Sequence, residues 1–277
     1  MAPRQALFLF QFEGAKQTTL DAYNLDLRYL GEWLNEKGKT IEKMTAQDWQ
    51  RFVHEKGWGF SAQKRALSAA RRYLRQEDIK APGIGRIMGK KHPLFRVPYA
   101  KGKRKEPRTL RLEQLDKLLA ACEGTHKPIR NRALILIMWD CGLRRREVAR
   151  LEWRNVDFAR KRIKVRTKAV SLEERHNETK RFFGEAEKAL QKWGEISTTL
   201  RVFGLSFEGV SSLIKRLAGK VDFPVSPHDF RRGRGAHFAE NGVSDRLAMK
   251  QLGISTHKVY MDYSGGADLD ALDRFIE

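Results

Sequence analysis

The chain has 277 residues, enough for one large domain or two ordinary ones, each with its own buried core. Its 55 lysines and arginines outnumber 34 aspartates and glutamates, which gives a net charge of +21 and a pI near 10.2. So basic a chain indicates a polyanionic partner. The absence of any apolar run near the roughly 20 residues of a membrane-spanning helix favours nucleic acid over a membrane.

The start of the chain and its two cysteines argue against a secreted protein and against a zinc- or disulfide-stabilised one. The apolar stretch from Ala6 to Phe12 is interrupted by Gln11 and has no small-residue cleavage site, so it does not fit a secretory signal. We therefore expect the protein to stay in the cytoplasm. Cys122 and Cys141 lie in apolar helical patterns without the paired spacing of a zinc site or disulfide framework. We expect reduced, buried thiols, no metal and no cofactor.

The amino-terminal part has helical spacing. Apolar residues between Leu20 and Leu34 recur every three or four positions, which predicts an amphipathic helix. A second helix is predicted to start after Thr45, and a third to run from after Ser61 to about Arg75.

The predicted third helix carries five cations on one face, namely Lys64, Arg65, Arg71, Arg72 and Arg75. A row of cations is most often a solvated surface. Acidic residues are almost absent here, however, so we expect these five side chains to contact DNA.

A basic linker follows. Residues 64–108 hold fifteen lysines and arginines but only three acids, and prolines and glycines gather in the second half of this stretch. Such a segment cannot be one continuous helix. We predict a helical nucleic-acid-binding domain over 1–100, a linker over 101–106 and a second domain over 107–277. Lys103, Arg104 and Lys105 in the linker would contact phosphates.

The second domain is predicted to be mainly helical with a small β-sheet. Its alternating strand runs from Arg162 to Arg166, and Glu178 to Phe183 is the expected partner. Helices are expected over Leu110–Cys122 and Arg130–Cys141, near Arg145, over Ala186–Trp193, and from about Gly235 to Asn241.

Three short segments of this domain, far apart in the chain, carry chemistry in combination. The first contains Gly142-Leu143-Arg144, with Glu147 three residues after the arginine. The second is His228-Asp229-Phe230-Arg231, and the third is Leu252-Gly253 followed by Tyr263. Each segment alone is a weak signal, because His-x-x-Arg and Gly-Leu-Arg are common by chance.

Together, in this order, the three segments resemble the tyrosine recombinase family of phage integrases and Xer-like enzymes. That family has Gly-Leu-Arg-x-x-Glu, His-x-x-Arg and a late tyrosine after Leu-Gly-His. The resemblance covers essentially the whole chain, because the first domain is similar to the family's helical core-binding domain. It implies a mixed α/β catalytic domain of the tyrosine recombinase type.

The resemblance also implies a role for each residue. Tyr263 would be the nucleophile, Arg144 and Arg231 the two active-site arginines, His228 the histidine of the second segment and Glu147 their acidic partner. Attack on a phosphodiester builds negative charge on the non-bridging oxygens, which guanidinium groups can hold. A tyrosine hydroxyl must also lose its proton, and an imidazole can accept it. This chemistry implies no metal.

The resemblance further implies a lysine in a β-hairpin as the general acid for the leaving 5′ oxygen. Lys168, just after the predicted strand, is our choice. Lys164 and Lys180 are alternatives, because the region is rich in lysine.

Two positions depart from the family pattern, and a second tyrosine competes for the role of nucleophile. Ile254 stands where the family has His or Trp, so a hydrogen-bond donor to the phosphate is missing, and His257 could substitute for it. Arg232 replaces a common histidine, with an expected effect on packing. Tyr260, one helical turn before Tyr263, is the rival nucleophile, although the spacing from Leu252-Gly253 favours Tyr263.

The C-terminal tail, residues 264–277, predicts a short helix with one apolar stripe behind a glycine hinge. So short a helix must dock to be stable. It could pack on its own domain, but the resemblance favours docking in a neighbouring protomer.

The resemblance implies site-specific recombination of double-stranded DNA through a 3′-phosphotyrosine intermediate and a Holliday junction, by a homotetramer on paired sites. The enzyme would act in the cytoplasm, on the nucleoid, or in a host cell if a phage or virus encodes it. A type IB topoisomerase-like enzyme, which acts as a monomer, is one alternative. A DNA-binding protein with a weakened active site, marked by Ile254, is the other.

Overall fold

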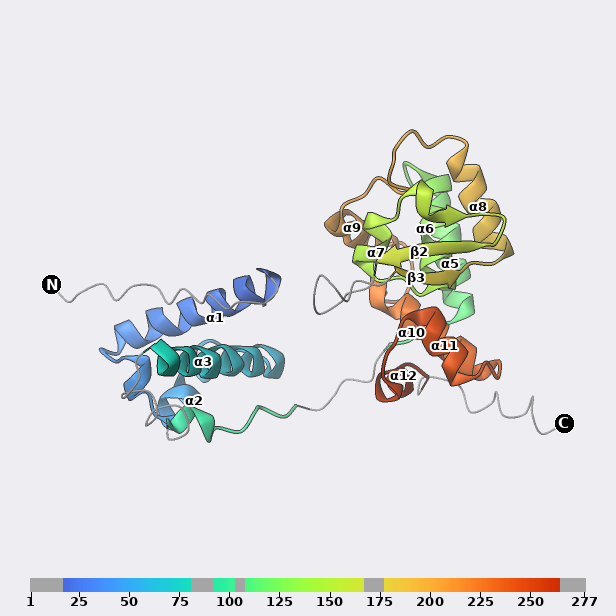
Figure 1. Cartoon of the computed structure of the whole chain (residues 1–277). Helices are drawn as coiled ribbons and strands as arrows, with labels where there is room; N and C mark the ends of the chain where they lie inside the picture. The colour runs from blue at the N-terminus through green and yellow to red at the C-terminus, as the bar shows by residue number, and fades with distance from the viewer. Residues whose placement is uncertain (1–16, 81–91, 103–107, 167–176, 265–277) are drawn as a thin grey trace. The chain divides into compact units, whose positions relative to one another are not determined.

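The computed structural model describes residues 17–80, 92–102, 108–166 and 177–264. The chain divides into two compact units, residues 1–104 and 105–277, drawn in Figure 1. The division falls inside the segment predicted to be the linker. Several predicted features, namely Lys103, Arg104, Lys105, Lys168 and the C-terminal helix, lie outside the described residues.

The first unit is helical throughout its described part. Its elements are α1 (Gln17–Glu36), η1 (Ile41–Lys43), α2 (Ala46–Glu55), α3 (Phe60–Lys80) and η2 (Pro93–Phe95). The Thr45 side chain accepts a hydrogen bond from the Asp48 backbone, and the Asp48 carboxylate accepts one from the Thr45 backbone. This reciprocal cap satisfies two backbone donors and fixes where α2 begins. The predicted start of the second helix, after Thr45, is thereby confirmed.

The first unit buries one apolar cluster between α1, α2 and α3, with Leu30 and Leu67 among its fully buried members. Two cations of α3 hold this unit together. Arg65 makes a two-pronged ion pair with buried Asp26 of α1, at 2.7 and 2.8 Å. Arg71 donates to the backbone carbonyls of Leu94, Phe95 and Val97.

The second unit contains most of the secondary structure. Its elements are α5 (Leu112–Glu123), α6 (Pro128–Cys141), α7 (Arg145–Arg150), η3 (Trp153–Asn155), β1 (Val156–Asp157), β2 (Arg162–Arg166), β3 (Asn177–Arg181), α8 (Gly184–Gly194), α9 (Phe207–Ala218), α10 (Pro227–Glu240), α11 (Asp245–Leu252) and α12 (His257–Ser264). In Figure 1, α10, α11 and α12 lie together at one end of the unit.

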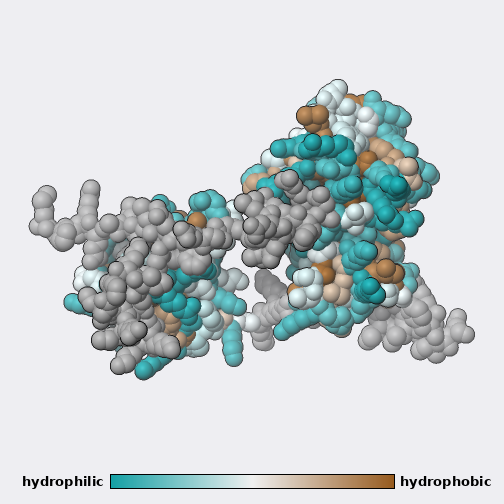
Figure 2. All heavy atoms as spheres, in the orientation of Figure 1, coloured by the Kyte–Doolittle hydropathy of each residue, from teal (hydrophilic) through white to brown (hydrophobic). Residues whose placement is uncertain are grey.

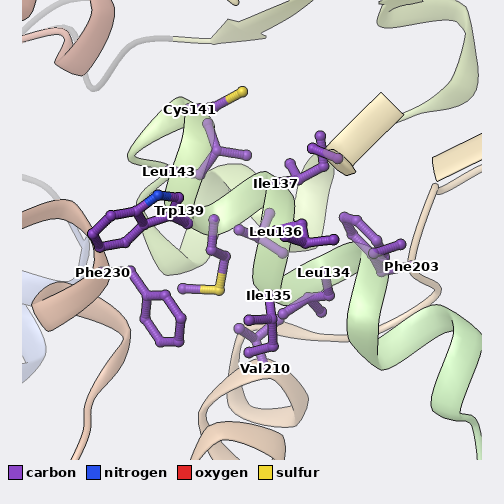
Figure 3. Packing of buried hydrophobic residues seen from close by; sticks show 14 of the residues in the cluster. Leu134, Ile135, Leu136, Ile137, Trp139, Cys141, Leu143, Phe203, Val210 and Phe230 are labelled. Carbon is purple, nitrogen blue, oxygen red and sulfur yellow. The ribbon is translucent and has the colours of Figure 1, made fainter. Parts of the chain in front are cut away.

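Helix α6 is the centre of the second core. Every residue from Ala133 to Cys141 is buried, because α5, α8 and α10 all pack against it. An α-helix that is apolar all round is stable only when covered on every side. Figure 3 shows the α6 side chains surrounded by Phe203, Val210 and Phe230 from other parts of the unit.

The sheet is antiparallel in the order β1-β2-β3, so β3 is an edge strand. Lys180 of β3 lies directly opposite Ile163 of β2. Ile163 and Val165 are buried, as their alternation predicts.

The structure corrects several predicted boundaries. The third helix is longer than predicted, from Phe60 to Lys80. The helix predicted to begin near Gly235 begins at Pro227, because Ser226 and Asp229 form a capping box and proline suits the first helical position. Helices α9, α11 and α12 were not predicted as elements.

The described surface is mainly hydrophilic in the view of Figure 2, with apolar residues in small patches. Among the described residues, no helix is both long enough and apolar enough to span a bilayer.

Candidate active site

Arg144 is placed by a turn between two helices. Helix α6 ends at Cys141, and Gly142 follows with a left-handed φ of 54°. Arg144 then caps α7, where its backbone N–H donates to Glu147 at 2.8 Å. The other oxygen of that carboxylate accepts from Nη1 of Arg144, also at 2.8 Å. Glu147 therefore fixes both the backbone and the side chain of the arginine.

His228 and Arg231 lie near the start of α10, three residues apart and so on one face. The cap formed by Ser226 and Asp229 anchors this part of the helix. The spacing His-x-x-Arg is thus a consequence of helical geometry, which brings the imidazole and the guanidinium toward one point.

Arg231 is fully buried. Its Nη1 donates to the Gly142 carbonyl at 2.8 Å and its Nη2 to the Gly253 carbonyl at 3.1 Å. The same Gly253 oxygen accepts from Nη2 of Arg144 at 3.0 Å, so one carbonyl joins both guanidinium groups. Among the described residues, Nε of Arg231 has no hydrogen-bond partner. Burial and the charge of Arg144 lower the pKa of Arg231.

Tyr263 reaches this cluster from α12. Its Oη lies 3.1 Å from Nε2 of His228, and the two rings meet edge to face with centroids 5.5 Å apart. The guanidinium of Arg231 lies 5.8 Å from the centre of the tyrosine ring. Helices α10 and α12 approach closely here, because a Cβ on Gly235 would be 3.0 Å from Cβ of Tyr263. The hydroxyl thus lies beside a base and close to an arginine.

The environment of His228 favours the neutral imidazole. Burial is the largest cause of its lowered pKa, and the positive charges of Arg232 and Arg231 lower it further. A neutral ring with Nε2 unprotonated can accept the hydrogen of the Tyr263 hydroxyl.

We expect His228 in the DNA-free protein to titrate below its usual pKa of 6.5, because both burial and neighbouring arginines disfavour the imidazolium. Histidine ring signals followed by NMR against pH, with His228→Gln to assign the signal, would measure this. Arg232→Ala should move the midpoint upward by removing one positive charge. A midpoint above 6.5 in the unaltered protein would contradict the environment described here.

The rival tyrosine and the substitute histidine lie elsewhere. Tyr260 is fully buried, and its hydroxyl has no hydrogen-bond partner among the described residues. His257 is exposed and pairs with Asp245 at 2.6 Å between Nε2 and Oδ2. Ile254 lies in a small apolar cluster with Tyr260 and Tyr263. The structure thus brings Tyr263 to the arginines and His228, and gives Tyr260 an apolar setting.

The lysine candidates differ sharply in exposure. Lys168 lies outside the described residues, in the segment between β2 and β3. Lys164 is exposed on β2, and Lys180 is fully buried on β3.

Sequence reasoning missed the backbone carbonyls that hold the arginines. Gly142 and Gly253 stand in the recognised motifs, yet nothing in a motif shows that their oxygens would be acceptors. It also missed Gln251, whose side chain bonds to the backbone of Asp140 and Arg181. An isolated glutamine in an exposed helical pattern gives no signal of such a role.

Two guanidinium groups, an imidazole and a tyrosine hydroxyl lie together here, and such a group of side chains is chemically able to support nucleophilic attack on a phosphodiester. Comparison with known proteins assigns the class. Residues 108–266 match the phage integrase family, and residues 7–76 match the phage integrase N-terminal SAM-like domain. The chain therefore belongs to the phage integrase family of tyrosine recombinases, a class of site-specific DNA recombinases.

Curated relatives are similar to this chain over most of its length. The chain is 27% identical to tyrosine recombinase XerD of Neisseria meningitidis serogroup A over 262 residues, covering 88% of this chain and 87% of the relative. It is 26% identical to XerA of Thermococcus kodakarensis, covering 90% of this chain and 86% of the relative.

Solved structures share the fold. A lambda integrase dimer bound to a COC′ core site matches with a TM-score of 0.74 at 16% identity, covering 91% of this chain and 90% of that one. XerH bound to a palindromic difH substrate matches with a TM-score of 0.71 at 17% identity, covering 95% and 80%.

Proposed function

We propose that this recombinase cuts one DNA strand by attack of Tyr263 Oη on the scissile phosphorus and rejoins it to a different strand. The observation that carries the proposal is the convergence of Tyr263 with His228, at 3.1 Å, beside the arginine pair. The bond to the leaving 5′ oxygen breaks as a 3′-phosphotyrosine bond forms. The energy of the broken ester is kept in that bond, so rejoining needs no ATP.

Each side chain would have one task. His228 accepts the proton of the tyrosine hydroxyl, and Arg144 and Arg231 stabilise the charge that grows on the non-bridging oxygens. Lys168 donates a proton to the leaving 5′ oxygen. Glu147 holds Arg144 in place through its two hydrogen bonds. Reversal of these steps, with a 5′ hydroxyl from another duplex as the attacking group, gives strand exchange.

We also propose that the active form is a homotetramer on two DNA sites, joined through a Holliday junction. A lambda integrase tetramer bound to a Holliday junction has this fold, with a TM-score of 0.69 at 16% identity. Paired strand exchanges require two sites to be held together, whereas relaxation of supercoils requires one. Docking of the tail, residues 265–277, in a neighbouring protomer would link the copies.

The test is a junction assay with a DNA site selected by the protein from random duplexes. The unaltered protein should form Holliday junctions from paired sites, and deletion of residues 267–277 should keep single-site binding but lose the tetramer in native gels or light scattering. Tetramers formed by the truncated protein would exclude the exchanged tail. Relaxation of any supercoiled plasmid, without junctions, would favour the topoisomerase-like alternative.

We propose that the exposed cations of α3 contact DNA phosphates and that the cations of this helix contribute unequally to DNA affinity. Lys64 and Arg75 are exposed, near the rings of Tyr99 and Phe95 respectively. Arg65 and Arg71 already bind protein groups, a carboxylate and three carbonyls. We infer that the first pair contributes more to DNA affinity, and the second pair more to the stability of the unit.

Lys64→Gln should weaken DNA binding and lower the slope of log affinity against log salt by about one, because one phosphate contact is lost. Its melting temperature should not change. Arg71→Gln is the matched comparison on the same helix, and it should lower the melting temperature because three carbonyls lose their donor. An unchanged salt slope for Lys64→Gln, measured by fluorescence anisotropy, would remove Lys64 from the interface.

A further inference from the structure

Lys180 is a fully buried lysine that the reaction scheme does not use. Its Nζ donates to the Gln251 carbonyl at 2.8 Å, near the end of α11, and lies 3.3 Å from Oε2 of Glu178. A buried ammonium costs several kcal/mol unless it is paired, and the position opposite buried Ile163 suits an apolar residue. Because Lys180 has no exposed surface, it acts through the groups that it holds.

The Gln251 side chain makes further contacts that hold the same end of α11. Its Nε2 donates to the carbonyls of Arg181 and Asp140, at 2.6 and 2.9 Å, and its Oε1 accepts from the Arg181 N–H at 3.0 Å. The amide thus pairs with both backbone groups of an edge-strand residue, as the peptide of a further strand would. Lys180 and Gln251, which we call the β3 clamp, fasten the end of α11 to the sheet.

The β3 clamp holds the turn that follows α11. Both active-site arginines donate hydrogen bonds to this turn. Gly253 follows with a left-handed φ of 61°, and a Cβ there would meet the Glu178 carboxylate at 1.9 Å. Its carbonyl accepts from Arg144 and Arg231 at 3.0 and 3.1 Å. A displacement of this carbonyl would therefore move both guanidinium groups together.

We propose that Lys180 and Gln251 are positioning residues, which set the active-site arginines by holding the Gly253 carbonyl against strand β3. This inference rests on the proposed function, in which the arginines stabilise charge on the phosphate. Misplacement of a reacting group by about 1 Å can cost around 100-fold in rate. A loosened clamp is expected to slow cleavage without weakening DNA binding.

The test uses Lys180→Met, which keeps the length and apolar stem of the side chain, and Gln251→Glu, which keeps one acceptor but loses both donors. Single-turnover cleavage of a nicked suicide substrate at saturating DNA should fall about 10- to 100-fold in each. The dissociation constant for DNA should stay near that of the unaltered protein. Each substitution leaves a backbone carbonyl without its donor and should lower the melting temperature, so cleavage is compared at a temperature at which circular dichroism shows every variant to be folded. Slow cleavage accompanied by an equal loss of binding, or of folded protein at that temperature, would overturn the proposal.

A second substrate separates positioning from proton donation. When sulfur replaces the bridging 5′ oxygen, the leaving thiolate needs no general acid, since thiols ionise near pH 8.5. Lys180→Met and Gln251→Glu should keep their rate loss on this substrate, because the arginines are still misplaced. Recovery of the normal rate by either variant would make the clamp part of the proton-donating machinery and end the proposal.

Lys168→Ala is the matched control, because its cleavage defect should disappear with the sulfur substrate. If the defect of Lys168→Ala persisted on the sulfur substrate, Lys168 would not be the proton donor. The positioning role proposed for the β3 clamp would be unaffected. If both clamp variants cleaved the oxygen substrate at the normal rate, Lys180 and Gln251 would have no positioning role. The proposed recombinase function would be unaffected.

Discussion

Tyr263→Phe is expected to abolish the covalent protein–DNA adduct while leaving DNA affinity nearly unchanged. The substitution removes only Oη, the atom that lies 3.1 Å from His228. The ring keeps its edge-to-face contact with the imidazole and its close packing on α10. Without an oxygen nucleophile, no phosphotyrosine bond can form. The adduct is measured on a nicked suicide substrate by denaturing gel.

Tyr260→Phe is the control for this experiment, because it removes the other tyrosine hydroxyl of the same helix. That hydroxyl is buried without a partner among the described residues, and burial raises its pKa, so its loss should cost little or even stabilise the fold. Adduct formation should persist. An adduct retained by Tyr263→Phe and lost by Tyr260→Phe would transfer the nucleophile to Tyr260.

Arg144→Ala and Arg231→Ala are each expected to lower the single-turnover cleavage rate about 1,000-fold or more. Both guanidinium groups donate to the Gly253 carbonyl, and that of Arg231 lies 5.8 Å from the centre of the Tyr263 ring, so positive charge is concentrated beside the nucleophile. DNA affinity should fall far less, because most of it comes from many other phosphate contacts.

Arg150→Ala is the matched control for charge, since Arg150 lies exposed at the other end of α7 from Arg144. It should cleave at close to the normal rate when DNA is saturating. Near-normal cleavage by Arg144→Ala or Arg231→Ala would remove that arginine from the active site.

The parts of the fold with strong local signals were predictable. The start of helix α2 after Thr45 was predicted, and β2 followed from the alternation of Ile163 and Val165. The start of α10 was not predicted although Ser226, Pro227 and Asp229 are a helix-start signal, because the segment from His228 to Arg231 was interpreted as a motif that precedes the helix. Helices α11 and α12 are short and depend on packing against their neighbours, so propensity alone does not define them.

The side chains of the candidate site could be predicted from the sequence. The backbone carbonyls and buried groups that hold them in place could not. Motif order named Arg144, Arg231, His228 and Tyr263, and the structure brings these four together. The sharing of one carbonyl by two arginines depends on long-range packing, which no local pattern encodes. The burial of Lys180 is also unreadable from sequence, because a lysine on an alternating strand normally faces water.

The complete burial of Arg231 has a consequence for selectivity among anions. Two backbone carbonyls already occupy its Nη1 and Nη2, and no part of the side chain is exposed. Each Nη of a guanidinium carries two hydrogens, so the carbonyls can keep their contacts while a phosphate oxygen reaches a second hydrogen, provided that the covering residues open. A free phosphate ion offers only a few contacts to offset that opening, whereas a long duplex contacts the protein over many phosphates. We therefore expect free phosphate to compete poorly with DNA for this site.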